Sequence, residues 1–243
     1  HFSSGHIERR QVGLWKLRAY DEPWMVPVLF EELERTHADV RTGVLDLLAE
    51  RATDDADAAL AWASVFDRDQ DHRGAAARRL AQRVDHVGET SERVRLVLAG
   101  ALGDARDGPP AAAAGLVNSL NLVELVPLLI HAQVASGGSQ PRTGDLAWIM
   151  VATQTAFVSD LQPVVSDSAV AFDPQLSVIT EGVLLRVGDA VVTTYRAPVH
   201  AALVDLTSRH YGSSTADMGY DREAWKAWYE AEFRPMLATL VEP

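Results

Sequence analysis

The sequence has no cysteine and only two lysines, Lys16 and Lys226. Without cysteine the chain has no disulfides, no thiol catalysis and no thiolate zinc site, and its cellular compartment stays open. No apolar run approaches the ~18 residues that span a bilayer as a helix, so we expect no transmembrane segment. Among 243 residues, 34 acids outnumber 22 bases, which gives a net charge of −12. This balance disfavours nucleic-acid binding, which needs clustered cations, and favours a protein partner with a basic surface.

The familiar catalytic motifs are also missing. The chain contains neither a G-x-S-x-G elbow nor a glycine-rich phosphate-binding loop, and no pair of its eight histidines has the spacing of a zinc protease helix. Acids are numerous between residues 145 and 195 and could supply oxygen ligands to a cation, but their spacing matches no EF-hand. We therefore predict a protein that is not an enzyme, with no catalytic residue, no metal site and no cofactor.

What the sequence does contain, over residues 6–134, is a succession of amphipathic helical segments. In the first of them Val12, Trp15 and Leu17 are predicted to share one side, and apolar residues within 26–33 do the same in the second. A later break is marked by Thr53 and the two acids that follow it, which are typical of a helix start.

Arginine recurs at matching points of these segments. Arg10, Arg41 and Arg73 are spaced 31 (41 − 10) and 32 (73 − 41) residues apart. A period in this range with one helix pair per unit indicates an α-solenoid, because a single pair cannot cover its own apolar face. The arginines could bind acidic groups of a partner, but we favour pairing with an acid of the neighbouring unit, such as Asp39 or Asp71.

At these residues the chain resembles the HEAT-repeat family, and its bacterial HEAT-like members in particular. The resemblance consists of an arginine in the first helix, the acidic turn Asp21-Glu22-Pro23, and a second helix that opens with Val26-Pro27, repeated at Val126-Pro127. It covers about half of the chain, and the third and fourth units depart from it. The resemblance implies an adaptor or scaffold and supplies no catalytic residues.

Residues 145–195 change character and predict a β-rich insertion. Partial alternation of apolar and polar residues, rich in valine, isoleucine and threonine, favours three or four antiparallel strands. Turns are predicted at Ser166-Asp167, Asp173-Pro174 and Gly188-Asp189. Insertions between repeats are common places for a binding feature, since they leave the stacking of the repeats intact.

The helical pattern returns at residues 196–235, which we interpret as capping helices. Val199, Ala202, Leu203 and Leu206 are predicted to lie on one face. Gly212 is expected to end that helix, and Asp221 is expected to begin the next, which Pro235 ends or kinks. Trp225 and Trp228 are predicted to be buried. The segment Gly219-Tyr220-Asp221 followed by these tryptophans is similar to the closing segment of some bacterial HEAT-like proteins.

The candidate partner-binding residues are Trp148, Phe157, Phe172, Asp173 and Tyr195. Aromatic residues on strands most often pack against a covered face, but on an acidic insertion they would anchor an interface instead. Both interpretations stay open from the sequence.

Together these patterns predict a mostly α fold, an α-solenoid of HEAT-type helix pairs with an antiparallel β insertion before the C-terminal helices, in one continuous domain. The function we favour is a non-enzymatic scaffold or adaptor that uses the helix face and the insertion. A homodimer that forms through an unpaired strand edge of the insertion is a further hypothesis. The alternatives are an accessory role like that of chromophore lyases, suggested by their likeness to HEAT-like proteins, and a self-assembling structural component.

Overall fold

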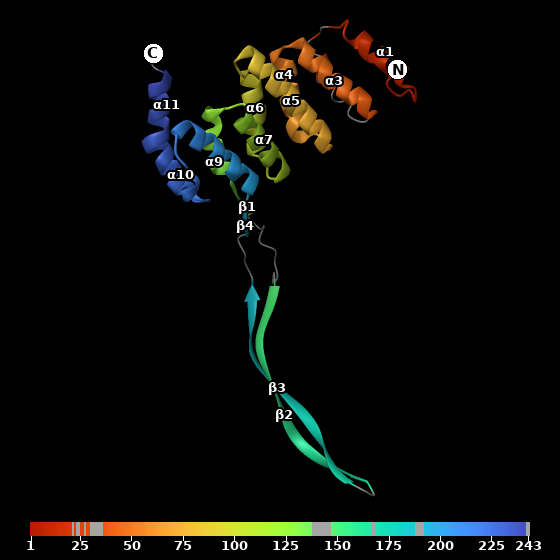
Figure 1. The fold of residues 1–243 in the computed structure, drawn as a ribbon, viewed down its shortest axis with the longest axis vertical. Helices are drawn as coiled ribbons and strands as arrows, with labels where there is room; N and C mark the ends of the chain where they lie inside the picture. The colour runs from red at the N-terminus through yellow and green to blue at the C-terminus, as the bar shows by residue number, and fades with distance from the viewer. Residues whose placement is uncertain are drawn as a thin grey trace. The chain divides into compact units, whose positions relative to one another are not determined.

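A computed structural model describes residues 1–20, 22, 25, 26, 28, 29, 36–137, 147–166, 169–187 and 192–241. The chain divides into two units, His1–Ala135 with Thr194–Pro243, and Ser136–Thr193. The first unit is helical and the second holds a long two-stranded antiparallel sheet (Figure 1). The coarse part of the predicted fold class, mostly α with an antiparallel β insertion, is therefore confirmed.

The helices before the insertion are α1 (Ile7–Leu17), α3 (Ala38–Arg51), α4 (Asp54–Phe66), α5 (Gln70–Val87), α6 (Glu92–Leu102), α7 (Gly108–Ser119), a 3-10 turn (Val123–Leu125) and α8 (Val126–Ala132). Those after it are α9 (Ala197–Tyr211), a 3-10 turn (Ala216–Met218), α10 (Arg222–Trp228), a π-helical turn (Tyr229–Phe233) and α11 (Arg234–Val241).

These helices contact one another in two parallel series. In one series α1 contacts α3 and α3 contacts α5; in the other α4 contacts α6, α6 contacts α8 and α8 contacts α10 (Figure 1). Successive helices such as α3 and α4, α4 and α5, and α6 and α7 join the two series. The interior between them is aliphatic, and its fully buried side chains include Leu45, Leu48, Leu60, Leu80, Leu98, Leu129, Leu203 and Leu206. Each such burial contributes about 1.5–3 kcal/mol, so the interior supplies most of the stability of this unit.

Ion pairs link helices that follow one another in the series. Arg10 of α1 binds Asp39 of α3 at 2.8 Å, which confirms the pairing predicted for that arginine. Arg41 binds Asp67 at 2.8 Å rather than Asp71. The expected acid was wrong because Asp67 follows the end of α4 at a half-buried corner, whereas Asp71 lies exposed in the first turn of α5.

The inward face of α1 differs from the prediction. Val12 and Trp15 are exposed, and the inward side carries Arg10, Gly13, Leu14 and Leu17 instead. Their spacing of three and four residues is a normal helical stripe. Two of the four positions in this inward stripe are occupied by arginine and glycine, which are not hydrophobic. The hydropathy of the residues therefore predicted the wrong side of the helix.

Helix ends follow the predicted chemistry. The Thr53 hydroxyl accepts a hydrogen bond from the Ala56 amide, and the Asp221 carboxylate accepts from the amides of Glu223 and Ala224. Gly212 ends α9 with φ of 79°, a left-handed conformation that glycine adopts at little cost. The apolar face predicted for this helix is also confirmed, because Val199, Ala202, Leu203 and Leu206 are all buried.

The predicted burial is confirmed for Trp225, while Trp228 is half-buried. Trp225 and Phe233 are fully buried, and Trp228 packs against them. Pro235 does not end the helix. A π-helical turn precedes it, and the chain continues as α11, since this wider turn accommodates a proline that offers no N–H.

The second unit is a ribbon of two strands, β2 (Ala147–Ser166) and β3 (Ala169–Val187). They pair antiparallel from Ala147↔Val187 to Ser166↔Ala169, with one irregularity between Val158 and Asp160. Two further short strands, β1 (Val134–Gly137) and β4 (Val192–Tyr195), pair with each other. We call β2 with β3 the ribbon.

The turn predicted at Asp173-Pro174 was wrong, because β3 runs through both residues. Asp173 pairs with Gln162, and Pro174 pairs with Leu161. Both strands of a two-stranded sheet are edge strands, where a proline can be placed without removing a ladder hydrogen bond. Asp167 and Gly188-Asp189, at the other two predicted turns, lie outside the described residues. Over the described part of the chain, no helix is both long and apolar enough to cross a membrane.

Candidate interaction site around Tyr195

Tyr195, a predicted partner-binding residue, heads a row of stacked rings. Its side chain is 59 % exposed, and its ring centroid lies 4.9 Å from that of Tyr220. Tyr220 stacks in turn on His200, with centroids 4.3 Å apart and planes 32° apart. Trp225 closes the row edge-on to His200 at 6.3 Å and donates its indole N–H to the Gly219 carbonyl at 2.7 Å. A buried tryptophan thus fixes the inner end of a row whose outer end faces solvent.

His200 is held from its other side by a buried amide. Its Nδ1 lies 2.8 Å from Oε1 of Gln133, an arrangement in which Nδ1 carries the proton. Burial lowers the pKa of His200, so the ring is neutral at neutral pH. Gln133 is fully buried, and its Nε2 has no hydrogen-bond partner among the described residues. Leaving such a donor unpaired costs about 1–3 kcal/mol, which the surrounding packing must offset.

Arg196, the next residue after Tyr195, fixes the backbone of this region. Its buried guanidinium donates from Nε to the Asp107 carboxylate at 2.9 Å and from Nη1 to the Ala132 carbonyl at 3.3 Å. Nη2 lies 3.2–3.5 Å from the three carbonyls of residues 104–106. The Arg196 amide also donates to the Gln133 carbonyl at 2.8 Å. One side chain therefore joins the α6–α7 loop, the end of α8 and the start of α9.

We call Gln133, Tyr195, Arg196, His200 and Tyr220 the Tyr195 cluster. It presents an exposed aromatic ring on a rigid support, which is the character of an interface anchor. It contains no nucleophile paired with a base, and a neutral imidazole hydrogen-bonded to an amide is not activated for proton transfer. Across the described residues, no three histidine, aspartate or glutamate side chains are grouped closely enough to hold a metal ion.

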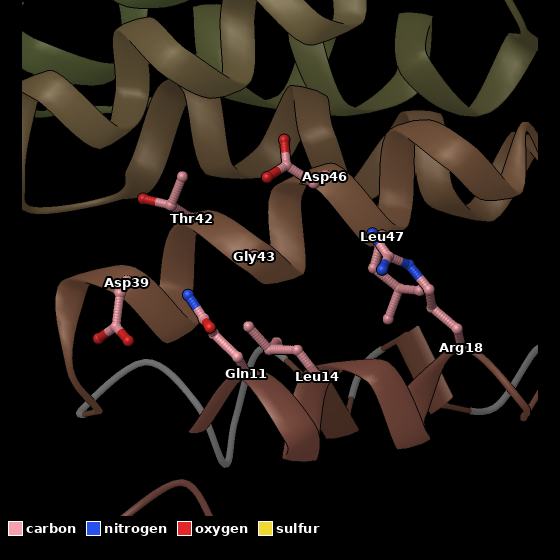
Figure 2. Close-up of a pocket in the computed structure, with 8 residues that line it drawn as sticks. All are labelled: Gln11, Leu14, Arg18, Asp39, Thr42, Gly43, Asp46 and Leu47. Carbon is pink, nitrogen blue, oxygen red and sulfur yellow. The ribbon is translucent and has the colours of Figure 1, made fainter. Parts of the chain in front are cut away.

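A groove of about 520 Å³ opens between α1 and α3 (Figure 2). It is lined by Gln11, Leu14, Arg18, Asp39, Thr42, Gly43, Asp46 and Leu47. A second groove of about 590 Å³ shares Arg18 and Asp46 with it and continues toward α5. Two of its three arginines are paired, since Arg18 binds Glu50 at 2.7 Å and Arg79 binds Asp46 at 2.6 Å. These ion pairs neutralise most of the charge that lines the second groove.

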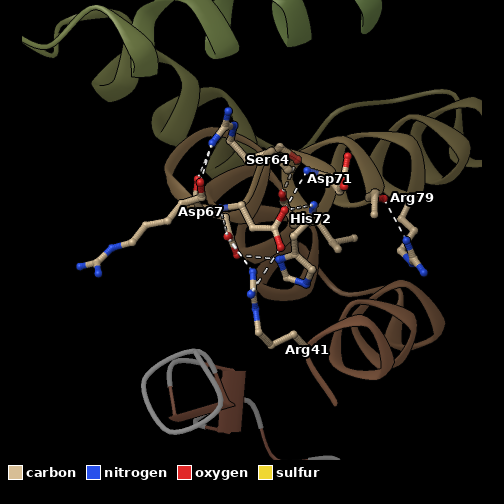
Figure 3. A network of polar contacts seen from close by, with 11 residues as sticks. Arg41, Ser64, Asp67, Asp71, His72 and Arg79 are labelled. Atoms are coloured by element: carbon tan, nitrogen blue, oxygen red, sulfur yellow. Dashed lines mark hydrogen bonds and ion pairs between the residues drawn. The ribbon is translucent and has the colours of Figure 1, made fainter. Parts of the chain in front are cut away.

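A network of polar contacts surrounds Asp67 (Figure 3). Its carboxylate accepts from Arg41 at 2.8 Å, from the Asp69 amide at 2.8 Å and from His72 Nδ1 at 2.6 Å. Arg73 donates to the Asp67 main-chain carbonyl at 2.8 Å. Burial opposes ionisation of Asp67, but these hydrogen bonds and the charge of Arg41 outweigh it and lower the pKa of Asp67. The network links α3, α4 and α5 and has the character of a structural cross-link.

The remaining predicted site residues lie on the ribbon. Trp148 pairs with Arg186 and Phe157 with Ser177, while Phe172 pairs with Pro163 and Asp173 with Gln162. Their side chains lie outside what the structure describes, so their role as anchors stays a prediction. Tyr195 is the candidate whose surroundings the structure shows.

Sequence reasoning missed Gln133, Arg196 and His200, which no motif marks. Tyr220 did carry a signal, because it belongs to the segment Gly219-Tyr220-Asp221. Each residue of that segment has a role in the structure. The Gly219 carbonyl accepts from Trp225, Tyr220 stacks between two rings, and Asp221 begins α10.

Comparison with protein-family models, with curated proteins and with solved structures finds no match to this chain.

Proposed function

We propose that the protein is a non-enzymatic scaffold that binds another protein, built as a HEAT-type α-solenoid and contacting its partner through the ribbon and a surface of the helices. The observation that carries the proposal is the ribbon itself. Its strands of 20 and 19 residues pair only with each other in the described sheet, so each leaves an edge of unpaired N–H and C=O groups. Such edges are the template for strand addition by a partner.

Two observations support the solenoid. Several helices contact the next helix but one as well as a sequence neighbour: α3 contacts α4 and α5, α4 contacts α5 and α6, and α6 contacts α7 and α8, as expected when helix pairs stack in sequence. Ion pairs also recur between residues about one repeat apart: Arg10 with Asp39, Arg18 with Glu50, and Arg79 with Asp46. These spacings of 29, 32 and 33 residues lie close to the period of the arginines in the sequence.

The composition of the ribbon supports contact with protein. Only four of its 39 residues are charged, Asp160, Asp173, Glu181 and Arg186, whereas 23% of the whole chain is charged. Low charge and aromatic residues are typical of interface centres. A strand pair left permanently in water would be expected to carry more charge.

Site-specific photo-crosslinking in the source cells tests the proposal. A photoreactive phenylalanine derivative replaces Trp148 or Phe157 on the ribbon, or Tyr195 in the cluster, with Val87 as the control site. Val87 is 59 % exposed at the end of α5 and belongs neither to the ribbon nor to the Tyr195 cluster. We expect discrete adducts with a protein from the ribbon positions and none from Val87. Equal, diffuse labelling from all four positions would refute the proposal.

A further inference from the structure

Apolar residues along the ribbon are placed on both of its faces. Three successive pairs are apolar on both strands: Ile149↔Leu185, Met150↔Leu184 and Val151↔Val183. Successive residues of a strand belong to opposite faces of the sheet. Three apolar pairs in a row therefore give both faces of the ribbon apolar character, unlike the alternation of a sheet with one face in water.

A ribbon of this kind is not stable alone. An isolated two-stranded hairpin is marginal in water at best, and three or more strands or a packed face are needed for independent stability. The pairing of the ribbon nevertheless continues over 19 pairs of residues. Something must cover at least one face to maintain that length.

The two halves of the ribbon differ in the residues that protect a strand edge. Pro163, Pro174, Asp160 and Asp173 all fall in the other half, and prolines and charges are the usual devices that keep strands from pairing further. Pairs from Ala147↔Val187 to Val158↔Leu176 contain no proline and carry only Glu181 and Arg186 as charges.

From these observations we infer that the occupant is the same ribbon of a second copy of this chain, with the two ribbons packed face to face. This inference rests on the proposed function and names its partner. Edge-to-edge pairing would satisfy backbone groups but would leave both apolar faces in water, whereas face packing at about 10 Å covers one apolar face of each ribbon. A second copy brings a surface of the same low charge, although the two chains carry −12 each and would otherwise repel.

The available area is sufficient. At about 3.3 Å per residue and about 4.8 Å between strands, the 19 pairs of the whole ribbon give a face roughly 63 Å long and 10 Å wide. That is about 630 Å², close to the roughly 800 Å² that each partner buries in a stable interface. The contact is isologous, since the same surface serves both copies.

Analytical ultracentrifugation of the full chain tests the inference. We expect a species of twice the 26.5 kDa chain mass at micromolar concentration. The double variants Ile149→Lys with Val151→Lys, and Met150→Lys with Leu184→Lys, each charge one face. At least one of them should weaken association tenfold or more, with unchanged helical circular dichroism. The control Leu96→Lys changes an apolar residue of α6 that is 62 % exposed and should leave association unchanged.

A monomeric full chain at 100 micromolar, or full association by both double variants, would overturn the inference. Equal loss of association in the Leu96→Lys control would also overturn it, because the contact would then lie elsewhere or be unspecific. A monomer that floats with phosphatidylcholine vesicles would identify a lipid surface as the occupant instead. In each case, protein adducts at Trp148 would leave the scaffold proposal standing, so the two failures can be told apart.

Discussion

Arg196→Met is the most informative single perturbation of the Tyr195 cluster. Methionine keeps the buried stem but removes every hydrogen bond of the guanidinium, of which the 2.9 Å bond to Asp107 and the 3.2 Å bond to the Asp104 carbonyl are the shortest. Hydrogen bonds from a charged donor contribute about 1.5–3 kcal/mol each. The Asp107 side chain is 67 % exposed, so its share is reduced to below about 1 kcal/mol. We expect a total loss of about 2–4 kcal/mol.

Urea denaturation followed by helical circular dichroism measures this loss, provided that the slope of the transition is unchanged. Arg209→Met is a matched control on the same helix. Arg209 is 49 % exposed and pairs with Asp205 at 2.7 Å, so its loss should cost less than about 1 kcal/mol. Equal effects of the two substitutions would refute the view that Arg196 joins the three segments around the cluster.

Three further predictions concern the helical unit. Asp67→Asn should lower stability by about 2 kcal/mol at pH 7, because it removes the nearer counter-charge of the half-buried Arg41, at 2.8 Å, and leaves only Asp69 at 3.7 Å. Because the pKa of Asp67 is lowered in the folded protein, its charge stabilises the fold above about pH 4. This contribution is lost as the pH falls through the folded pKa. The difference in unfolding free energy between wild type and Asp67→Asn should therefore vanish in acid. Trp225→Ala should cost about 3–5 kcal/mol by creating a cavity, against less than about 1 kcal/mol for Trp15→Ala, whose ring is 68 % exposed. Gly212→Ala should cost about 1 kcal/mol because its φ is 79°.

Each of these is measured as a free energy of unfolding, and each has an outcome that counts against it. A difference between wild type and Asp67→Asn that does not shrink as the pH falls below about 4 would mean that the carboxylate charge is not the source of the stability. Similar costs for the two tryptophan variants would contradict the burial of Trp225. An unchanged or increased stability of Gly212→Ala would contradict the left-handed end of α9.

Helix boundaries were predictable because their causes are local. Thr53, Gly212 and Asp221 each act within a few residues of chain, through a side-chain cap or a backbone angle. Burial of Trp225 was predictable for a similar reason, since an aromatic stripe at helical spacing must be covered by something. The mistakes came where a position depends on a distant part of the chain.

Two such mistakes are instructive. The inward side of α1 includes Arg10 and Gly13, and Arg10 is buried because Asp39, 29 residues away, accepts its hydrogen bonds. Asp173-Pro174 has the composition of a turn, yet it continues a strand because Gln162 and Leu161 lie opposite. The composition of a segment reflects the local preferences of its residues. At both places a contact with a distant residue overrides those preferences.

The Tyr195 cluster was beyond sequence reasoning for the same reason. Gln133 and His200 are 67 residues apart, with the entire ribbon between them, and neither belongs to a motif. Arg196 reaches carbonyls about 90 residues away. Tyr195 was found because it is aromatic and close to the insertion, which are properties of a single residue and its place in the chain.

The most direct test of the scaffold account is capture of partners from an extract of the source cells, with the full chain and a variant lacking the ribbon used side by side. In that variant a two-residue Asn-Gly linker replaces residues 138–191 and joins β1 to β4, which pair with each other. The account predicts that the full chain retains a specific protein and that the variant does not retain it. A tagged second copy of this chain counts as such a protein. Retention of the same proteins by both, or of none by either, would contradict it.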